Sequence, residues 1–222
     1  IEIRRSQSGD ESRDRRWLHT SPEYALKRVL CSGLDRVYHL GSSFRDEPSS
    51  STHSPEFTML EWYMRDASLD DLMSQCERLL CTLASRMLED PPSIIATDQT
   101  SQNDVLRRLN ALQAPFERLS VHEAFLRYAH IDLLEHPTAE RLAEAAREVG
   151  VAERGLHGGW DALYFQIFMD KIEPHLGRDR PTFLYNFPAS QAALAKLDPH
   201  DSRWALRFEI FIDGIELANA FD

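Results

Sequence analysis

The sequence predicts an α+β fold in which helices flank a mostly antiparallel sheet and a helical insertion separates parts of that sheet. Two strand pairs predict the sheet, namely residues 37–45 with 56–63 and residues 207–212 with 215–219. A two-residue Asp-Gly turn joins the second pair, which is a strong hairpin signal. Apolar residues at helical spacing between the two pairs predict the helices.

The composition is typical of a globular protein and excludes some classes of function. Hydrophobic residues make up 42% and charged residues 27% of the 222 residues, which suits one domain with a substantial core. The net charge of −11 argues against broad, sequence-independent binding of nucleic acid. No apolar run approaches the ~20 residues of a membrane span, and no signal peptide is visible. We therefore expect a cytoplasmic protein without a membrane partner.

The first predicted helix covers residues 22–30. Thr20 and Glu23 have the spacing of a capping box, and Pro22 falls in the first turn. A strand over residues 37–45 follows, and a polar loop separates it from the next strand.

The strand over residues 56–63 has one face of unusual composition. Phe57, Met59, Glu61 and Tyr63 share this face, because side chains alternate along a strand. An aromatic plane, a carboxylate and a phenol, with an arginine arriving from the preceding strand, suit a purine, an ammonium group and a phosphate. The alternative is a half-buried hairpin with incidental charges.

The chain between the strand pairs is predicted to be mainly helical. We expect helices over residues 69–88, 120–129, 138–149 and 160–172, and a loop with a short helix over residues 93–113. Ser120 and Glu123 have the spacing of a capping box, and Gly150 is a plausible helix stop. Residues from about 101 to 175 are therefore predicted to form a helical insertion. A strand over residues 182–187 and a short helix or turn over residues 189–196 follow.

The final hairpin carries two glutamates that we expect on one face. A regular two-residue turn would place Phe211 opposite Glu216 and Glu209 opposite Ala218. Glu209 and Glu216 then form a diagonal pair, roughly 7–8 Å apart at the backbone. Two carboxylates at this distance repel each other unless a cation lies between them or one of them binds a proton. Mg²⁺ suits this arrangement because it takes one or two carboxylates plus phosphate oxygens. The alternative is two glutamates on a solvent face.

These motifs resemble those of the class II aminoacyl-tRNA synthetases. Residues 44–47 read Phe-Arg-Asp-Glu, like the core of motif 2, and residues 53–63 read HSPEFTMLEWY, like the second strand of the lysine branch. Residues 214–222, GIELANAFD, resemble the hairpin that reads GIELANGFxE in the family. The resemblance implies that residues 1–222 form a class II synthetase-like catalytic domain. The family's motif 1 would lie before this segment and motif 3 after it.

The resemblance also implies an enzyme that uses ATP and Mg²⁺ to convert a lysine-type amino acid into an aminoacyl-adenylate. Arg45 would be the catalytic residue, since its planar guanidinium can bridge a phosphate and a carboxylate. The residues implied to bind ATP are Arg45, Glu47, His53, Ser54, Phe57, Glu216 and Leu217; those implied to bind the amino acid are Ser21, Glu23, Glu61, Tyr63 and Asn219; and the implied Mg²⁺ ligands are Glu209 and Glu216. For Ser21 and Glu23, plain helix capping is the alternative.

Three residues depart from the family pattern. Asp46 and Ser54 stand where asparagine is usual, and Ala220 replaces a glycine. The Ser54 side chain is shorter than that of the asparagine that reads adenine, so a water or a backbone group would have to replace it. The arginine, the stacking phenylalanine and the glutamate pair are all retained.

Within the lysine branch, the chain resembles the shortened synthetase paralogues that aminoacylate a lysine of elongation factor P. This narrower resemblance depends on Leu-Glu-Trp-Tyr at residues 60–63 and on Leu-Ala at residues 217–218. It implies (R)-β-lysine or lysine as substrate, elongation factor P as acyl acceptor and a homodimer, and it makes tRNA a less favoured partner. The alternatives are a lysyl-tRNA synthetase and a non-catalytic synthetase-like module.

Overall fold

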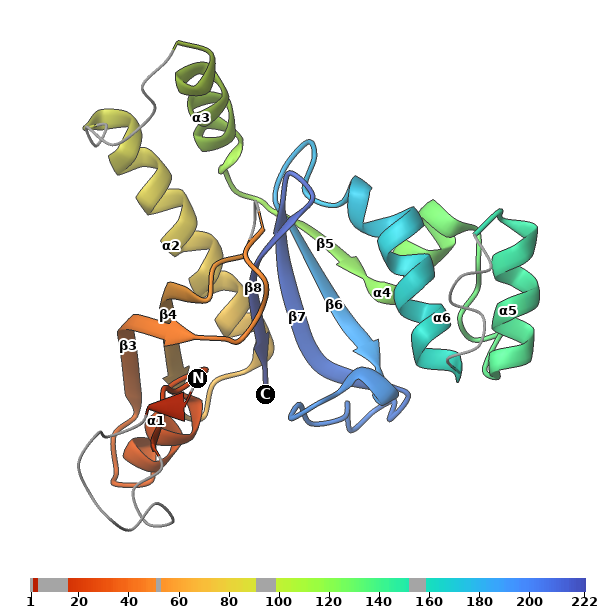
Figure 1. Ribbon diagram of the computed structural model, residues 1–222, viewed down its shortest axis with the longest axis horizontal. Helices are drawn as coiled ribbons and strands as arrows, with labels where there is room; N and C mark the ends of the chain where they lie inside the picture. Colours follow the sequence, from red (N-terminus) through yellow and green to blue (C-terminus); the bar gives the residue numbers. More distant parts are fainter. Residues whose placement is uncertain (1, 4–15, 51–52, 91–98, 152–158) are drawn as a thin grey trace. The chain divides into compact units, whose positions relative to one another are not determined.

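The computed structural model describes residues 2–3, 16–50, 53–90, 99–151 and 159–222. The chain forms two compact units, Ile1–Ala67 (unit 1) and Ser68–Asp222 (unit 2) (Figure 1). Unit 1 contains β1 (Glu2–Ile3), β2 (Arg16–Trp17), α1 (Glu23–Leu30), β3 (Arg36–Phe44) and β4 (Glu56–Met64). Unit 2 contains α2 (Leu69–Glu89), α3 (Gln99–Ala111), β5 (Glu117–Ser120), α4 (Val121–Ala124), η1 (Phe125–Ala129), α5 (Ala139–Glu148), α6 (Gly159–Ile167), η3 (Phe168–Ile172), η4 (Glu173–His175), β6 (Thr182–Pro188), η5 (Ala189–Gln191), β7 (Trp204–Ile212) and β8 (Ile215–Phe221). The organisation as one catalytic domain stays a prediction.

The β3–β4 hairpin is the main sheet of unit 1. Its strands pair antiparallel in unbroken register, from Arg36 opposite Met64 to Phe44 opposite Glu56. β1 and β2 form a separate two-stranded sheet. Both predicted strands of the hairpin are confirmed to within one residue at each end.

Helix α1 packs against both strands of the hairpin, and its start differs from the prediction. The expected capping box relied on Thr20, but the backbone N–H of Glu23 donates to Ser21 Oγ at 3.0 Å. Pro22 precedes the first helical residue and makes no side-chain hydrogen bond. The prediction for Thr20 is therefore wrong, because the residue one position later in the chain satisfies the backbone donor.

Unit 2 is built on a four-stranded sheet in the order β5-β6-β7-β8. β5 and β6 are parallel, and the other two pairs are antiparallel. A parallel pair needs a long crossover connection, and here that connection holds all the elements from α4 to η4. The sequence did not predict β5, because a strand of four residues is too short to show an alternating pattern.

The helix boundaries in the crossover follow the local sequence signals. Ser120 and Glu123 make both halves of the predicted capping box at the start of α4. Thr138 caps α5 by accepting from the backbone N–H of Arg141. Gly150 follows α5 with a φ of 73°, a left-handed conformation that glycine adopts without strain.

The predicted helices over residues 120–129 and 160–172 each contain two kinds of helix. α4 continues into the π-helix η1, and α6 continues into the π-helix η3. Single-turn π segments are rare in proteins overall, but those that occur often lie at functional sites.

Two helices precede β5. α2 confirms the helix predicted over residues 69–88, and α3 is longer than the short helix expected within residues 93–113. Residues 93–98 lie outside the described part of the chain. None of the helices in the described part of the chain combines the length and the hydrophobicity that a membrane span requires.

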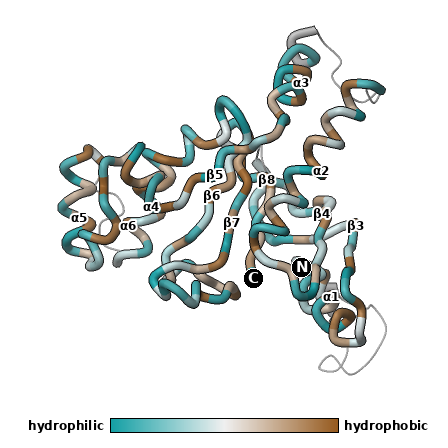
Figure 2. Tube along the Cα trace, turned by 180° about the vertical axis from the view of Figure 1, so that it is seen from behind, coloured by the Kyte–Doolittle hydropathy of each residue, from teal (hydrophilic) through white to brown (hydrophobic). Residues whose placement is uncertain are grey.

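The core of unit 2 lies between one face of the sheet and the crossover helices. Leu184 and Phe211 of the sheet belong to the same buried cluster as Phe125, Tyr164 and Phe168 of the helices. The rings of Phe125 and Tyr164 stack with centroids 5.0 Å apart, and those of Phe168 and Phe211 lie 6.2 Å apart. Hydrophobic and hydrophilic residues alternate along α5 (Figure 2), as expected of a helix with one buried face.

Candidate active site

A carboxylate held by two hydroxyl groups lies on the β3–β4 hairpin of unit 1. Ser21 Oγ donates to Glu61 Oε2 at 2.7 Å, and Tyr63 Oη donates to Glu61 Oε1 at 2.7 Å. Burial, and next the hydrogen bond to Glu61, raise the pKa of Tyr63 above its usual range, so the phenol stays protonated as a donor. Together these groups fix the carboxyl group of Glu61 on the face that the alternation predicted.

A second carboxylate of this region already contacts an ammonium group. Lys27 Nζ lies 2.7 Å from Glu23 Oε1 and 5.7 Å from the centroid of the Tyr63 ring. Carboxylates and aromatic faces are the groups that proteins use to bind primary ammonium ions. The two carboxylates and the phenol can therefore recognise a lysine-type amine.

Arg45 and Phe57 lie together at the end of the hairpin where the loop joins β3 to β4. The Arg45 guanidinium carbon is 5.3 Å from the centroid of the Phe57 ring. The backbone N–H of Arg45 donates to Pro55 O at 2.9 Å, which continues the pairing of the two strands by one further bond. A planar cation beside an aromatic face suits a phosphate next to a flat base.

The loop beyond this end holds the other predicted nucleotide ligands of unit 1. Ser50 Oγ lies 3.2 Å from His53 Nδ1 and also accepts from the backbone N–H of His53. Glu47 and Ser54 are exposed. Their predicted roles toward adenine stay predictions.

In unit 2, the β7–β8 hairpin has a different register from the predicted one. The turn pairs Phe211 with Glu216 as expected, but a β-bulge then follows. Glu209 consequently lies opposite Asn219 and not opposite Ala218. The predicted register for Glu209 is wrong, because the bulge inserts one extra residue, Leu217, into β8.

The bulge has a useful consequence for the side chains. Residues directly opposite each other in a ladder point to the same face. Glu209 and Phe211 share one face of β7, so their partners Asn219 and Glu216 point to that face as well. An unbroken ladder would have placed Ala218 there. The bulge thus collects all three predicted polar ligands of the hairpin on one side.

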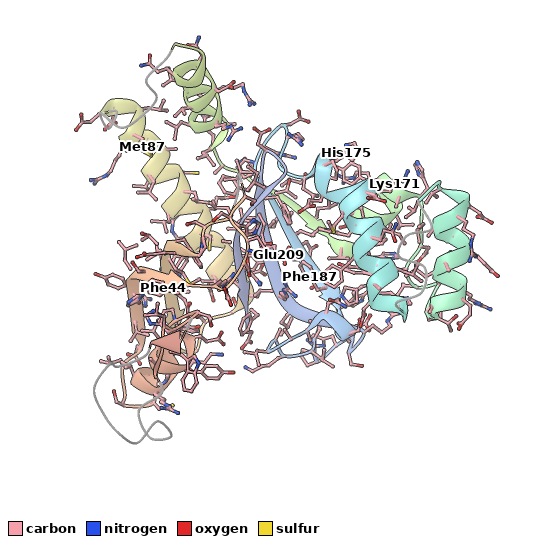
Figure 3. All side chains as sticks on the ribbon, in the orientation of Figure 1. Phe44, Met87, Lys171, His175, Phe187 and Glu209 are labelled. Carbon is pink, nitrogen blue, oxygen red and sulfur yellow. The ribbon has the colours of Figure 1, made fainter. Side chains whose placement is uncertain are left out.

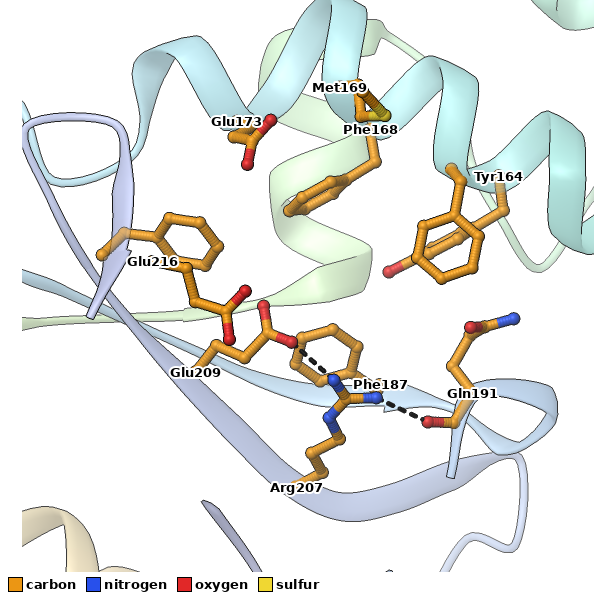
Figure 4. A pocket seen from close by; sticks show the side chains of 11 residues that line it. Tyr164, Phe168, Met169, Glu173, Phe187, Gln191, Arg207, Glu209 and Glu216 are labelled. Carbon is orange, nitrogen blue, oxygen red and sulfur yellow. Dashed lines mark hydrogen bonds and ion pairs between the residues drawn. The ribbon is translucent and has the colours of Figure 1, made fainter. Parts of the chain in front are cut away.

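A pocket of about 160 Å³ lies against this face within unit 2 (Figure 4). Its walls are mostly aromatic or polar, and they come from α6, η3 and η4 on one side and from the sheet and η5 on the other. The lining residues are Tyr164, Phe165, Phe168, Met169, Glu173, Phe187, Gln191, Arg207, Glu209, Phe211 and Glu216. Figure 3 shows Phe187 and Glu209 on the sheet among the other side chains.

Glu209 is a buried carboxylate in this pocket, with 6% of its surface exposed. Burial first, and then the negative charge of Glu216, raise the pKa of Glu209 to about 7, although Arg207 opposes this. A carboxyl group in this environment gains from a nearby cation. Among the described residues, no group of three or more metal-ligating side chains occurs. Two carboxylates fit Mg²⁺ that reaches the protein with its phosphate ligands.

Arg207 is a residue of this pocket that the sequence analysis missed. It donates to Glu209 Oε1 at 2.6 Å, to Asn219 Oδ1 at 3.2 Å and to Gln191 O at 2.8 Å. Its guanidinium carbon lies 4.5 Å from the centroid of the Phe187 ring. One signal was available in the sequence, since an arginine two residues before Glu209 shares its face of the strand.

The hydroxyl group of Tyr164 also lines the pocket. It is fully buried, and it has no hydrogen-bond partner among the described residues. Buried hydroxyl groups normally have a partner. Figure 4 shows Tyr164 and Phe168 projecting from the helices on the side of the pocket opposite Arg207.

The predicted residues thus fall into three local groups. Unit 1 brings Ser21, Glu23, Glu61 and Tyr63 together around α1 and β4, and it brings Arg45 beside Phe57. Unit 2 brings Glu209, Glu216 and Asn219 onto one face. Leu217, predicted from the resemblance to bind ATP, is the exposed bulge residue.

Comparison with known proteins shows similarity along nearly the whole chain. Residues 6–222 match the family of tRNA synthetases class II (D, K and N). The chain is 40% identical over 206 residues to the elongation factor P–(R)-beta-lysine ligase of Yersinia enterocolitica, covering 92% of this chain and 55% of that protein. Proteins with the same name from Pectobacterium carotovorum and Photorhabdus laumondii are 39% and 37% identical with the same coverage. The chain spans about half the length of the curated relatives it matches.

Proposed function

Because this chain belongs to the class II tRNA synthetases (D, K and N), we propose that it activates (R)-β-lysine with ATP and transfers the acyl group to a lysine of elongation factor P. The observation that carries the amino-acid part is the Glu61 carboxylate, held at 2.7 Å by both Ser21 and Tyr63. A carboxylate fixed in this way is prepared for an ammonium group. The names of the relatives support the choice of acyl group and acceptor.

In the first step, a carboxylate oxygen of the amino acid attacks the α-phosphorus of ATP. A P–O bond forms, the bond to pyrophosphate breaks, and pyrophosphate leaves with the electron pair. Arg45 holds the amino-acid carboxylate against the α-phosphate and stabilises the charge that gathers there. Phe57 stacks on the adenine. When bound through Glu209 and Glu216, Mg²⁺ would neutralise phosphate charge.

The amine groups of the substrate decide which amino acid is used. A lysine-type substrate carries two ammonium groups, and unit 1 presents the two carboxylates Glu23 and Glu61. Asn219 supplies an amide for the substrate carboxylate. An amino acid without a side-chain amine would leave Glu61 without a cationic partner, which is costly in a partly buried site, whereas Glu23 would keep its ion pair with Lys27.

In the second step, the amine of an acceptor lysine attacks the carbonyl carbon of the adenylate. A C–N bond forms, AMP leaves with the electron pair of the C–O bond, and the attacking nitrogen loses a proton. We propose elongation factor P as this acceptor, which the names of the relatives support, and a homodimer as the working form, which the resemblance to the class II synthetases implies.

Amino-acid-dependent ATP–pyrophosphate exchange by the full-length protein tests the first step. We expect strong exchange with (R)-β-lysine, weaker exchange with L-α-lysine and none without an amino acid. A preference for L-α-lysine, with transfer to tRNA, would favour a lysyl-tRNA synthetase. No exchange with either amino acid by a folded protein that binds ATP would refute the proposal and favour a non-catalytic module.

A further inference from the structure

We propose that Arg207 is a positioning residue that ties Glu209 to Asn219, so that metal binding and amino-acid binding depend on one guanidinium. The inference rests on the proposed function, because it takes Glu209 as a metal ligand and Asn219 as a substrate ligand.

The contacts of Arg207 reach three separate places in unit 2. The guanidinium donates to Glu209 on the same strand, to Asn219 on β8 and to the backbone carbonyl of Gln191 in η5. Only 17% of the Arg207 side chain is exposed, and 8% of the Glu209 side chain. The pair is therefore largely removed from water. Solvent screens it less than it screens an ion pair on the surface.

The β-bulge makes this bridge possible. The ladder places Arg207 opposite Phe221 and Glu209 opposite Asn219, so Asn219 lies diagonally across from Arg207 on the same face. In a regular hairpin Ala218 would occupy the place of Asn219, and Arg207 would have no amide to hold. The bulge thus brings Asn219 within reach of Arg207, and the hydrogen bond from Arg207 holds the amide there.

The chemistry of the guanidinium explains why arginine stands here. Its planar fork presents several N–H donors in fixed directions, so one group can hold a carboxylate, an amide and a carbonyl at once. The ring of Phe187, 4.5 Å from the guanidinium carbon, supports the plane from one side. A lysine at this position would keep the charge and the packing of the stem, but a single ammonium cannot reach the same three acceptors.

This arrangement accounts for the orientation of both ligands. Arg207 takes Oε1 of Glu209, which leaves Oε2 for a cation. It takes Oδ1 of Asn219, which directs the side-chain NH₂ away from Arg207 as a donor toward a carboxylate. Without Arg207, the Asn219 amide would rotate and Glu209 would be a buried carboxylate without its guanidinium.

Arg207→Lys in the full-length protein tests the proposal, with Arg203→Lys as the matched control. Arg203 lies just before β7 and pairs with Asp201 outside the pocket, with 60% of its side chain exposed. Mn²⁺ binding in the presence of ATP, followed by electron paramagnetic resonance, gives a readout that needs no turnover. We expect the Kd for Mn²⁺ and the KM for the amino acid each to rise at least about tenfold in Arg207→Lys and to stay unchanged in Arg203→Lys.

A double-mutant cycle distinguishes positioning from general destabilisation. If Arg207 acts on the amino acid through Asn219, then Arg207→Lys combined with Asn219→Ala should raise the KM for the amino acid no further than Asn219→Ala alone. Additive effects, or an unchanged Kd for Mn²⁺ in a folded Arg207→Lys protein, would overturn the inference. If the wild-type protein shows no exchange at all, the proposed function fails, whereas the Mn²⁺ titration still reports on Arg207.

Discussion

Replacing Glu61 by glutamine is the most direct probe of the amine-binding site in unit 1. The change keeps the shape of the side chain and removes its charge. Both carboxylate oxygens are used, since Ser21 and Tyr63 each donate to one of them at 2.7 Å. In Glu61→Gln, one of the two hydroxyl groups has to accept from the new NH₂ group, which a hydroxyl can do by rotating. We therefore expect the fold to survive at a cost of about 1 kcal/mol.

The effect on substrate recognition should be larger. A hydrogen bond to a charged group is worth about 1.5–3 kcal/mol, and the ammonium of the substrate would lose such a partner. This corresponds to a decrease of roughly 10- to 150-fold in kcat/KM for the amino acid, at about 1.4 kcal/mol for each factor of ten. The KM for ATP should change little, because Glu61 is not among the predicted nucleotide ligands.

Glu56→Gln is the matched control for this experiment. Glu56 begins the same strand, lies on the opposite face and accepts from Ser42 Oγ at 3.1 Å. It therefore loses the same charge outside the proposed site. ATP–pyrophosphate exchange over a range of amino-acid concentrations measures both variants. If kcat/KM in Glu61→Gln stays within twofold of the wild-type value, or falls equally in Glu56→Gln, then Glu61 does not bind the substrate amine.

Three further predictions concern other parts of the molecule. The pKa of Glu209 is raised from an ordinary 4.5 to about 7. Between these two pH values the folded state therefore binds more protons than the unfolded state. As pH rises through that window, the contribution of Glu209 to the free energy of unfolding falls. Glu209→Gln should remove this fall, as measured by urea denaturation at pH 5 and pH 7.5 in EDTA; an unchanged pH dependence would contradict the raised pKa. Tyr164→Phe should leave the free energy of unfolding unchanged or raise it by about 1 kcal/mol, because the buried hydroxyl has no partner among the described residues. A loss above about 1 kcal/mol in urea denaturation would mean that the hydroxyl makes a stabilising hydrogen bond. Phe57→Leu should raise the KM for ATP about tenfold without changing the KM for the amino acid, since stacking on a base is worth about 1–3 kcal/mol; equal changes in both constants would argue against stacking.

Much of the local structure could be predicted because its causes lie within a few residues. The capping box of Ser120 and Glu123 formed as expected, since the side chain of an N-cap residue lies beside the backbone N–H group three residues later. The hairpin over β7 and β8 followed from its Asp-Gly turn, and the alternating faces of β4 followed from the period of a strand.

The features that the sequence analysis missed or misassigned depend on how the chain packs, and not on local sequence. β5 is a strand because β6 lies beside it, and its four residues carry no pattern of their own. The start of α1 was misassigned because Thr20 and Ser21 are chemically alike, and only the backbone path decides which hydroxyl meets the N–H of Glu23. The bulge at Leu217 leaves no mark in the spacing of the polar residues, so a regular ladder placed Ala218 opposite Glu209.

The sequence by itself therefore determined the family, the fold class and the types of residue that could carry the chemistry. Those properties depend on short motifs, turn residues and hydrophobic period, which are all local in the chain. Only the tertiary structure decided that Asn219 points to the same face as Glu209, that Arg207 holds both, and that burial raises the pKa of Glu209. These properties depend on register, side-chain reach and exclusion of water between segments distant in sequence, and such effects exist only once the strands and helices have packed.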